Sequence, residues 1–149
     1  MSHFIVATHG YFAKGIMDAV RMICGEQKNF TTFCAYTENE NGELEIQVTE
    51  KIKDLLDSYP EEEDVIVLVD LLGGSVCNEF IKQIDRRPFH LISGVNLGLI
   101  LEFIYAPDKL NKDMIETMIE RSRSSIMYIN KLVDEERKKA DNVNDWKGV

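Results

Sequence analysis

The run Val65 to Val69 is apolar at five successive positions, and Asp70 follows it directly. A strand without polar alternation is buried on both faces, an arrangement that occurs almost only in parallel sheets with helices on each side. A chain of 149 residues is long enough for one domain of this kind. The run is therefore predicted to be a central strand of an α/β fold.

Strand-like and helix-like segments alternate along the rest of the chain. Phe12, Ile16 and Val20, for example, fall on one helical face, and Gly25 is placed to end that helix. The pattern predicts strands at residues 4–8, 30–37, 65–70 and 88–95, and helices at residues 12–24, 48–59, 73–86, 97–105 and 112–123. We expect a doubly wound, mostly parallel sheet of four or five strands, flanked by helices on both faces.

The C-terminal part of the sequence is less regular. Residues 124–130 fit either a continuation of the preceding helix or a further strand, and the pattern leaves both open. Residues 134–149 are dense in charge and are expected to form a charged helix end followed by a frayed tail. We therefore predict one domain over residues 1–133 and a C-terminal segment over residues 134–149.

The composition excludes several classes of function. A formal charge of −9 and an isoelectric point near 4.8 oppose general binding to nucleic acid or anionic lipid. The three cysteines lack CxxC spacing, and no metal motif or phosphate-binding glycine motif of a nucleotide enzyme occurs. No signal peptide or membrane-spanning run is present. We expect a cytoplasmic protein without metal or cofactor.

Three predicted strand ends carry the polar residues of interest, and ligands of doubly wound sheets bind at such ends. Thr8, His9 and Gly10 stand at the end of the first strand, Asp70 ends the third, and residues 93–96 stand at the end of the fourth. A carboxylate that orients one ring nitrogen of a histidine leaves the other nitrogen free as a nucleophile. His9 and Asp70 without a serine nucleophile indicate phosphorylation of the imidazole. A hydrogen-bonded loop histidine and a loop-capping aspartate remain the alternatives.

The turn Gly73-Gly74-Ser75 precedes a predicted helix. Backbone N–H groups at a helix start, together with a hydroxyl and the helix dipole, suit a phosphoryl group. A tight turn in which Ser75 is only an N-cap fits this pattern equally well.

Three blocks, FIVATHG at residues 4–10, VDLLGGSVCNE at residues 69–79 and SGVNLGLILE at residues 93–102, resemble the IIA component of the mannose family of the bacterial sugar phosphotransferase system. The resemblance implies that His9 accepts a phosphoryl group and that Asp70 hydrogen-bonds its imidazole. It further implies a phosphoryl-binding turn at Gly73, Gly74 and Ser75, with supporting loop residues at Thr8, Gly10 and Asn96.

The same resemblance implies the partners. The histidine-containing phosphocarrier protein would donate the phosphoryl group, a IIB component on a separate chain would accept it, and membrane IIC and IID components would be served indirectly. Family members are homodimers that exchange a C-terminal strand, which gives residues 124–130 an expected role. The family often has an aromatic residue and a proline where this sequence has Leu72 and Val76. We expect both departures at the rim of the site, where they affect partner docking.

Other functions remain open at this stage. The chain is also compatible with the phosphoryl-donor subunit of a dihydroxyacetone kinase, or with a non-catalytic regulator that reports a phosphorylation state. A receiver-like domain phosphorylated on Asp70 is disfavoured, because receivers need an acidic pair after the first strand and Thr8-His9 stands there. In the family that the sequence resembles, the membrane subunits determine which sugar is transported, so a IIA sequence does not identify the sugar.

Overall fold

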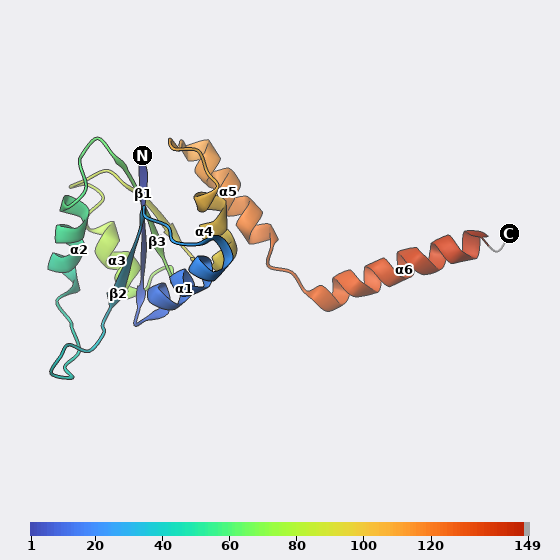
Figure 1. Cartoon of the computed structure of the whole chain (residues 1–149), viewed down its shortest axis with the longest axis horizontal. Helices are drawn as coiled ribbons and strands as arrows, with labels where there is room; N and C mark the ends of the chain where they lie inside the picture. Colours follow the sequence, from blue (N-terminus) through green and yellow to red (C-terminus); the bar gives the residue numbers. More distant parts are fainter. Residues whose placement is uncertain (148–149) are drawn as a thin grey trace.

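Parallel strands form the middle layer of the molecule, and helices cover both sides of it (Figure 1). The computed structural model describes residues 1–147, and within them there are four strands and six helices. The strands are β1 (Ser2–His9), β2 (Phe30–Ala35), β3 (Asp64–Val69) and β4 (His90–Ser93). The helices are α1 (Phe12–Cys24), α2 (Val48–Asp57), α3 (Ser75–Ile81), α4 (Leu97–Ile104), α5 (Lys112–Ser124) and α6 (Ile129–Lys147).

The strand order is β2-β1-β3-β4, and every pairing between these strands is parallel. The chain moves to one side of β1 to form β2 and to the other side to form β3 and β4. The doubly wound fold is thereby confirmed, with its topological switch point between β1 and β3. Ala7 is in register with Val69, so His9 and Asp70 leave the sheet next to one another. Ligands of such folds bind at this point.

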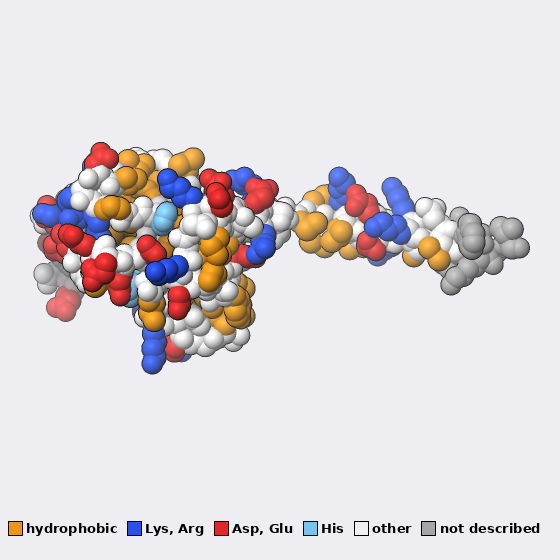
Figure 2. All heavy atoms as spheres, turned by 90° about the horizontal axis from the view of Figure 1, so that it is seen from above, with side chains coloured by type: hydrophobic (Ala, Val, Ile, Leu, Met, Phe, Trp, Pro, Cys, Tyr) orange, Lys and Arg blue, Asp and Glu red, His pale blue; other side chains and the backbone are white. Residues whose placement is uncertain are grey.

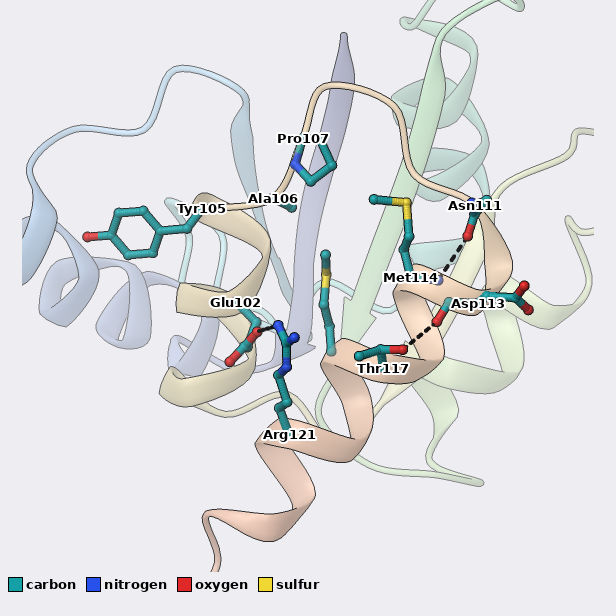
Figure 3. Close-up of a pocket in the computed structure, with 10 residues that line it drawn as sticks. Glu102, Tyr105, Ala106, Pro107, Asn111, Asp113, Met114, Thr117 and Arg121 are labelled. Atoms are coloured by element: carbon teal, nitrogen blue, oxygen red, sulfur yellow. Dashed lines mark hydrogen bonds and ion pairs between the residues drawn. The ribbon is translucent and has the colours of Figure 1, made fainter.

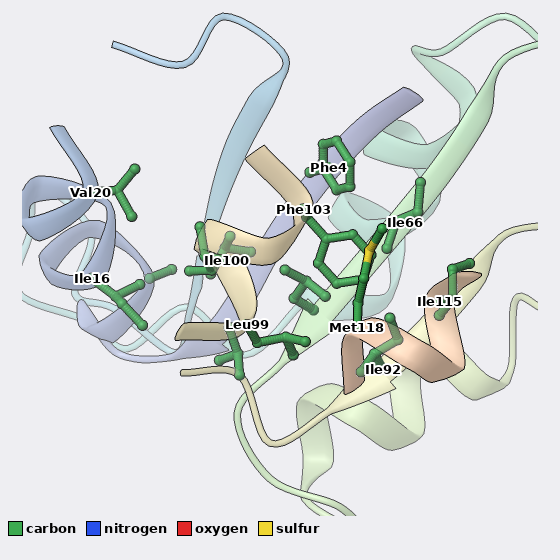
Figure 4. Packing of buried hydrophobic residues seen from close by; sticks show 14 of the residues in the cluster. Phe4, Ile16, Val20, Ile66, Ile92, Leu99, Ile100, Phe103, Ile115 and Met118 are labelled. Carbon is green, nitrogen blue, oxygen red and sulfur yellow. The ribbon is translucent and has the colours of Figure 1, made fainter. Parts of the chain in front are cut away.

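One face of the sheet is covered by α1, α4 and α5, whose apolar residues pack on Phe4, Val6, Ile66 and Leu68. Figure 4 shows Phe103 of α4 and Met118 of α5 meeting above the strands. Phe4 also stacks on Phe30 of β2, with ring centroids 4.6 Å apart. This layer anchors the helices that follow His9 and the β4 exit.

The other face is covered by α2 and α3. Ile52 and Leu56 of α2 and Phe80 of α3 are fully buried against Ile5 and Val67. Successive residues of β1 and β3 therefore point into opposite cores, which is why these strands are apolar at nearly every position. The prediction that the run Val65 to Val69 is central and covered on both faces is confirmed.

The third helix is shorter than the sequence pattern predicts. We expected a helix over residues 73–86, whereas α3 ends at Ile81. The chain then continues in turns, in which the Gln83 N–H donates to the Phe80 carbonyl at 2.9 Å and the Ile84 N–H donates to the Ile81 carbonyl at 3.2 Å. These turns lead to the buried Arg87, whose guanidinium hydrogen-bonds the carbonyls that follow α2. Arg87 thereby ties the turns after α3 to the segment after α2.

The segment 124–130 is neither a continuous helix nor a strand in this chain. Helix α5 ends at Ser124, where the Ser125 N–H and hydroxyl both donate to the Ser122 carbonyl, and α6 begins at Ile129. Serine hydroxyls compete in this way with helical hydrogen bonds. Helix α6 runs through the division that we predicted after residue 133, and residues 148 and 149 of the expected tail lie outside the described residues.

Helix α6 projects away from the sheet (Figure 1), and each of its residues from Ile129 to Val143 is exposed. Figure 2 shows charged side chains of both signs along this arm and hydrophobic side chains gathered at its base. The exposed apolar residues of this base are Ile126, Met127, Tyr128, Ile129, Leu132 and Val133. In the part of the chain that is described, no helix combines the length and apolarity needed to cross a bilayer.

Candidate phosphotransfer site

His9 is the last residue of β1 and lies at the switch point. The preceding Thr8 is fully buried, and its hydroxyl oxygen accepts a hydrogen bond from the Ala13 N–H at 2.7 Å. The following Gly10 has a φ of 53° and donates its N–H to the Ala35 carbonyl at 2.7 Å. A left-handed conformation at this turn favours glycine. Thr8 and Gly10 therefore fix the chain on both sides of His9, as supporting loop residues would.

The carboxylate of Asp70 holds the imidazole of His9. Its Oδ2 atom accepts the ring Nδ1–H of His9 at 2.8 Å and the backbone N–H of His9 at 2.8 Å. Its Oδ1 atom accepts the Leu71 N–H at 2.9 Å. With the proton on Nδ1, the lone pair of Nε2 is available, which is the tautomer that a phosphoryl acceptor needs.

Hydrogen bonds also govern the ionisation of Asp70. Partial burial of the carboxyl disfavours its charged form, but the hydrogen bonds from the backbone and ring of His9 and the attraction of the imidazole outweigh it. Together they hold the pKa of Asp70 below its ordinary value. Asp70 is therefore a carboxylate at neutral pH and can accept both hydrogen bonds from His9.

The turn before α3 approaches His9 from the other side. The hydroxyl of Ser75 lies 3.0 Å from Nε2 of His9 and donates to it when Nδ1 carries the proton. A Cβ atom on Gly74 would lie 3.2 Å from Cε1 of His9, closer than nearly all real contacts of this kind. Gly73 has a φ of 75°, which favours glycine at this position. A larger residue is therefore disfavoured at Gly74 by the space available and at Gly73 by the backbone conformation.

Backbone N–H groups at the start of α3 point out of the helix. The Asn78 N–H makes the first intrahelical hydrogen bond, to the Gly74 carbonyl at 3.0 Å. The N–H groups of residues 75–77 precede this bond and stand at the end of α3 next to His9. The turn can therefore offer both a hydroxyl and backbone amides to an anionic group near Nε2.

Asn96 stands at the exit of β4 and caps α4. Its side-chain oxygen accepts the Leu99 N–H at 2.9 Å and the Ser122 hydroxyl at 3.0 Å. Its side-chain amide donates to the Gly94 carbonyl at 3.3 Å. Asn96 thus connects the β4 loop to α5, whereas the contacts of His9 come from Asp70 and the α3 turn. The expectation that Asn96 holds the adjoining loop agrees with these bonds.

The two departures from the family pattern differ in location. Leu72 is 77% exposed and lies on the loop after Asp70, as expected of a rim residue. Val76 is fully buried among the apolar residues of α2 and α3, so the expectation that it lies at the rim is wrong. Its position in the first turn of a helix that packs on the sheet explains the difference.

One contact of His9 and one surface feature near it were not predicted from the sequence. The ring of Tyr36, the residue after β2, lies 5.7 Å from the imidazole between ring centroids. The sequence feature that could have predicted this contact is an aromatic residue at the end of a strand that neighbours β1. Exposed apolar side chains also follow His9 and Asp70 in sequence. We call these residues the apolar collar; they are Tyr11, Phe12, Leu71 and Leu72.

A pocket of about 430 Å³ lies elsewhere, between α4 and α5 (Figure 3). Arg121 and Glu102 form an ion pair in its lining, with 3.4 Å between Nη1 and Oε2, and Met114 also lines it. None of the residues around His9 lines this pocket. Over the described residues, no three His, Cys, Asp or Glu side chains are close enough to hold a metal ion.

Comparison with protein families places these features in context. A family model described as the PTS system fructose IIA component matches residues 3–120. The chain is 31% identical over 129 residues to the fructose-specific EIIA component of Bacillus subtilis (strain 168), which covers 84% of both chains. It is 30% identical over 105 residues to the mannose-specific EIIAB component of Escherichia coli (strain K12). The match spans 70% of this chain but 31% of that longer protein.

Solved structures give the same picture. A crystal structure from Klebsiella pneumoniae, assigned to a phosphoenolpyruvate-dependent sugar phosphotransferase system, superposes with a TM-score of 0.79 at 35% identity. The superposition covers 89% of this chain and 93% of the other. A IIA protein of Streptococcus pneumoniae, associated with a fucose utilization operon, gives a TM-score of 0.75 at 26% identity and covers 89% and 96% of the two chains.

Proposed function

Because the chain belongs to the mannose and fructose family of IIA components of the sugar phosphotransferase system, we propose that it carries a phosphoryl group on His9 between two partner proteins. The donor is the histidine-containing phosphocarrier protein, and the acceptor is a IIB component on a separate chain. Transfer takes place in the cytoplasm and serves membrane IIC and IID components indirectly.

The observation that carries this proposal is the state of the His9 ring. Nδ1 is held by a carboxylate with a lowered pKa, while Nε2 faces a serine hydroxyl and solvent, with 42% of the His9 side chain exposed. A loop histidine with only a structural role needs neither this tautomer nor a second nitrogen that a partner can reach. A nucleophile needs both.

The transfer step follows from this arrangement. The Ser75 hydroxyl turns from Nε2 to a phosphoryl oxygen, and the freed Nε2 lone pair of His9 attacks the phosphorus atom of the phosphorylated carrier. A P–N bond to Nε2 forms while the P–N bond to the carrier histidine breaks, and that histidine leaves with the bonding electron pair. The proton on Nδ1 of His9 stays in its hydrogen bond to Asp70, which stabilises the positive charge of the phosphorylated ring. In the second transfer a histidine nitrogen of IIB attacks the phosphorus atom, the P–N bond to Nε2 breaks, and His9 leaves with the bonding electron pair.

The α3 turn supports the proposal as a phosphoryl cradle. Its free backbone N–H groups and the Ser75 hydroxyl lie on the Nε2 side of the ring. Such donors stabilise phosphoryl oxygens without being reorganised during the reaction. We propose that Gly73 and Gly74 serve this cradle by allowing the backbone to come close to the imidazole.

The apolar collar supports the proposal that partners dock around His9. Exposed aromatic and leucine side chains are typical anchors of protein interfaces, and they directly follow the two central residues of the site. Both partners must bring their histidine to the same Nε2 atom. They are therefore proposed to use this surface in turn.

We also propose that the protein is a homodimer. The exposed apolar base of α6, residues 126–133, supports this, because such a cluster is rarely left in contact with water. Residues 126–128, which connect α5 and α6, are in neither a helix nor a strand in this chain, which leaves them free to pair with a second copy. Sedimentation equilibrium of wild type and of Ile126→Asp/Tyr128→Asp tests it: a wild-type dimer that the double variant dissociates is expected, and a wild-type monomer contradicts it.

The deciding experiment is phosphorylation by the general phosphotransferase enzyme, the carrier and phosphoenolpyruvate, followed by intact mass measurement. A gain of about 80 Da is expected. It should require the carrier, be labile in acid and stable in base, and vanish in His9→Ala. The matched control is His90→Gln, a histidine of β4 that does not contact His9 and should retain the gain.

The outcomes separate the proposed function from its alternatives. No mass gain with an active carrier would overturn it in favour of a non-catalytic regulator. A gain that passes only to a dihydroxyacetone kinase subunit, and not to IIB, would replace the acceptor in the proposal.

A further inference from the structure

Tyr36 has an unusual backbone conformation next to the site. Among the described residues it is the one non-glycine residue with a positive φ, at 58°. The left-handed region is disfavoured for side chains with a Cβ atom, and especially for bulky ones. Such a residue persists where surrounding contacts hold it, and such residues concentrate at functional sites. The contacts that hold Tyr36 in this conformation therefore bear on the function of the site.

The conformation places the Tyr36 ring against His9. Ala35 is in register with His9 across β1 and β2, and its carbonyl accepts the Gly10 N–H. The chain turns out of β2 at the next residue, and the Tyr36 ring then lies 5.7 Å from the imidazole with an interplanar angle of 31°. This distance is within the range of attractive aromatic pairs. The half-buried ring also packs on the core beneath α2 and α3.

The imidazole is thereby held by several contacts. Asp70 fixes Nδ1, the Ser75 hydroxyl faces Nε2, and the Gly74 backbone lies close to Cε1. Hydrogen bonds at the ring nitrogens fix the position of the ring edge but resist rotation about the axis between them only weakly. An attractive contact with a second ring resists this rotation, because turning the imidazole would disturb the pairing of the two rings.

We propose that Tyr36 is a positioning residue for phosphoryl transfer, whose ring keeps the imidazole of His9 in the orientation that directs Nε2 at the incoming phosphorus. The inference rests on the proposed function of His9. In-line transfer depends steeply on the direction of the attacking lone pair. The aromatic ring is the active feature, since the contact is between rings.

Two substitutions separate the ring from the rest of the side chain. Tyr36→Phe keeps the ring, and Tyr36→Leu keeps an apolar side chain without it. The matched control is Tyr59→Leu, because Tyr59 is also partly buried against the same core but lies beside His3, at the opposite end of β1. Two quantities are measured in each protein: the single-turnover rate of transfer from the phosphorylated carrier, and the NMR chemical shift of the His9 Cε1–H proton.

Transfer to Tyr36→Leu is expected to be about five- to tenfold slower than to wild type. Tyr36→Phe and Tyr59→Leu should stay within about twofold of wild type. The His9 proton should shift in Tyr36→Leu alone, as the ring current of the tyrosine is lost. Thermal midpoints identify any variant that does not fold, and Tyr36→Asn, which tolerates the left-handed region, then replaces Tyr36→Leu.

Equal rates in wild type and Tyr36→Leu would overturn the inference, and so would an equal loss in Tyr59→Leu, which would indicate general destabilisation. A slow Tyr36→Phe would also overturn it, because the hydroxyl would then be the active group. Failure of the proposed function gives a different result. In that case the wild-type protein itself accepts no phosphoryl group from an active carrier.

Discussion

One carboxylate oxygen of Asp70 accepts two hydrogen bonds from a single residue, the backbone N–H and the ring Nδ1–H of His9, both at 2.8 Å. The backbone bond ties the end of β1 to the end of β3, and the ring bond selects the tautomer. The position of the main chain and the chemistry of the side chain at His9 are therefore set by the same atom.

Asp70→Asn is expected to slow phosphorylation of His9 by about 10- to 100-fold, the usual effect of losing a carboxylate that orients a functional histidine. The amide oxygen can still accept the Nδ1–H, but it carries no charge to stabilise the phosphorylated ring. Rapid-quench measurement of transfer from the carrier checks this. Asp85→Asn, an exposed carboxylate, is the control, and equal rates in the two variants would contradict the role of Asp70.

The lowered pKa of Asp70 predicts how stability depends on pH. The ordinary value is 3.8, and the value in the folded state is lower. The unfolded chain therefore binds the proton first, and the carboxylate stabilises the fold above pH 3.8. This stabilisation is lost as the pH falls below that value and through the pKa of the folded state.

Urea unfolding of wild type and Asp70→Asn between about pH 7 and pH 3 measures this effect. The free-energy difference between the two proteins should be constant near neutrality and shrink in acid. A difference that grows as the pH falls would mean that the pKa of Asp70 is raised by folding.

Gly74→Ala is expected to impair phosphorylation more than folding. The added methyl group would meet His9 Cε1 at 3.2 Å and the Leu71 carbonyl oxygen at 3.2 Å, so the imidazole must move. The φ of −69° at Gly74 is open to alanine. In Gly15→Ala, by contrast, the methyl group enters open space on a helix and should stabilise the protein by about 1 kcal/mol. Transfer rates and thermal midpoints of both variants test the contrast.

Arg87 is expected to matter for stability and not for phosphorylation. The residue is 7% exposed and donates to the carbonyls of Tyr59 and Pro60, each at 2.8 Å. Arg87→Ala leaves two carbonyls without their donor and should cost about 2–3 kcal/mol. Arg86→Ala removes a more exposed ion pair with Asp57 and should cost less than about 1 kcal/mol. Urea unfolding measures the loss of stability in both variants, and equal losses would contradict the structural role of Arg87.

Leu72→Asp is expected to weaken binding of the carrier by about tenfold or more, because it places a charge within the apolar collar. Leu72 is exposed, so stability should not change. Leu44→Asp, on the exposed loop before α2, makes the same substitution away from His9. Calorimetric titration of both variants with the carrier decides whether the collar is the docking surface.

Much of this architecture can be predicted from local patterns in the sequence. The apolar runs of β1 and β3 have no polar face and therefore had to be central strands, and the helical spacing of α1 and α2 required sheet faces to pack on. Polar residues that end apolar strands pointed to His9, Asp70 and the α3 turn. The inferences about the fold succeed because burial and periodicity act over a few neighbouring residues.

Other features depend on contacts between residues far apart in sequence. Periodicity does not specify strand order, yet only the placement of β1 beside β3 brings His9 to Asp70. The turns that follow α3 lead to Arg87, whose hydrogen bond to the Tyr59 carbonyl spans 28 positions of the sequence. The burial of Val76 and the left-handed turn at Tyr36 likewise follow from packing against other elements. The residue types of the site were thus readable along the chain, whereas its geometry arose only when the sheet assembled, because distances between strand ends are set by pairing and packing.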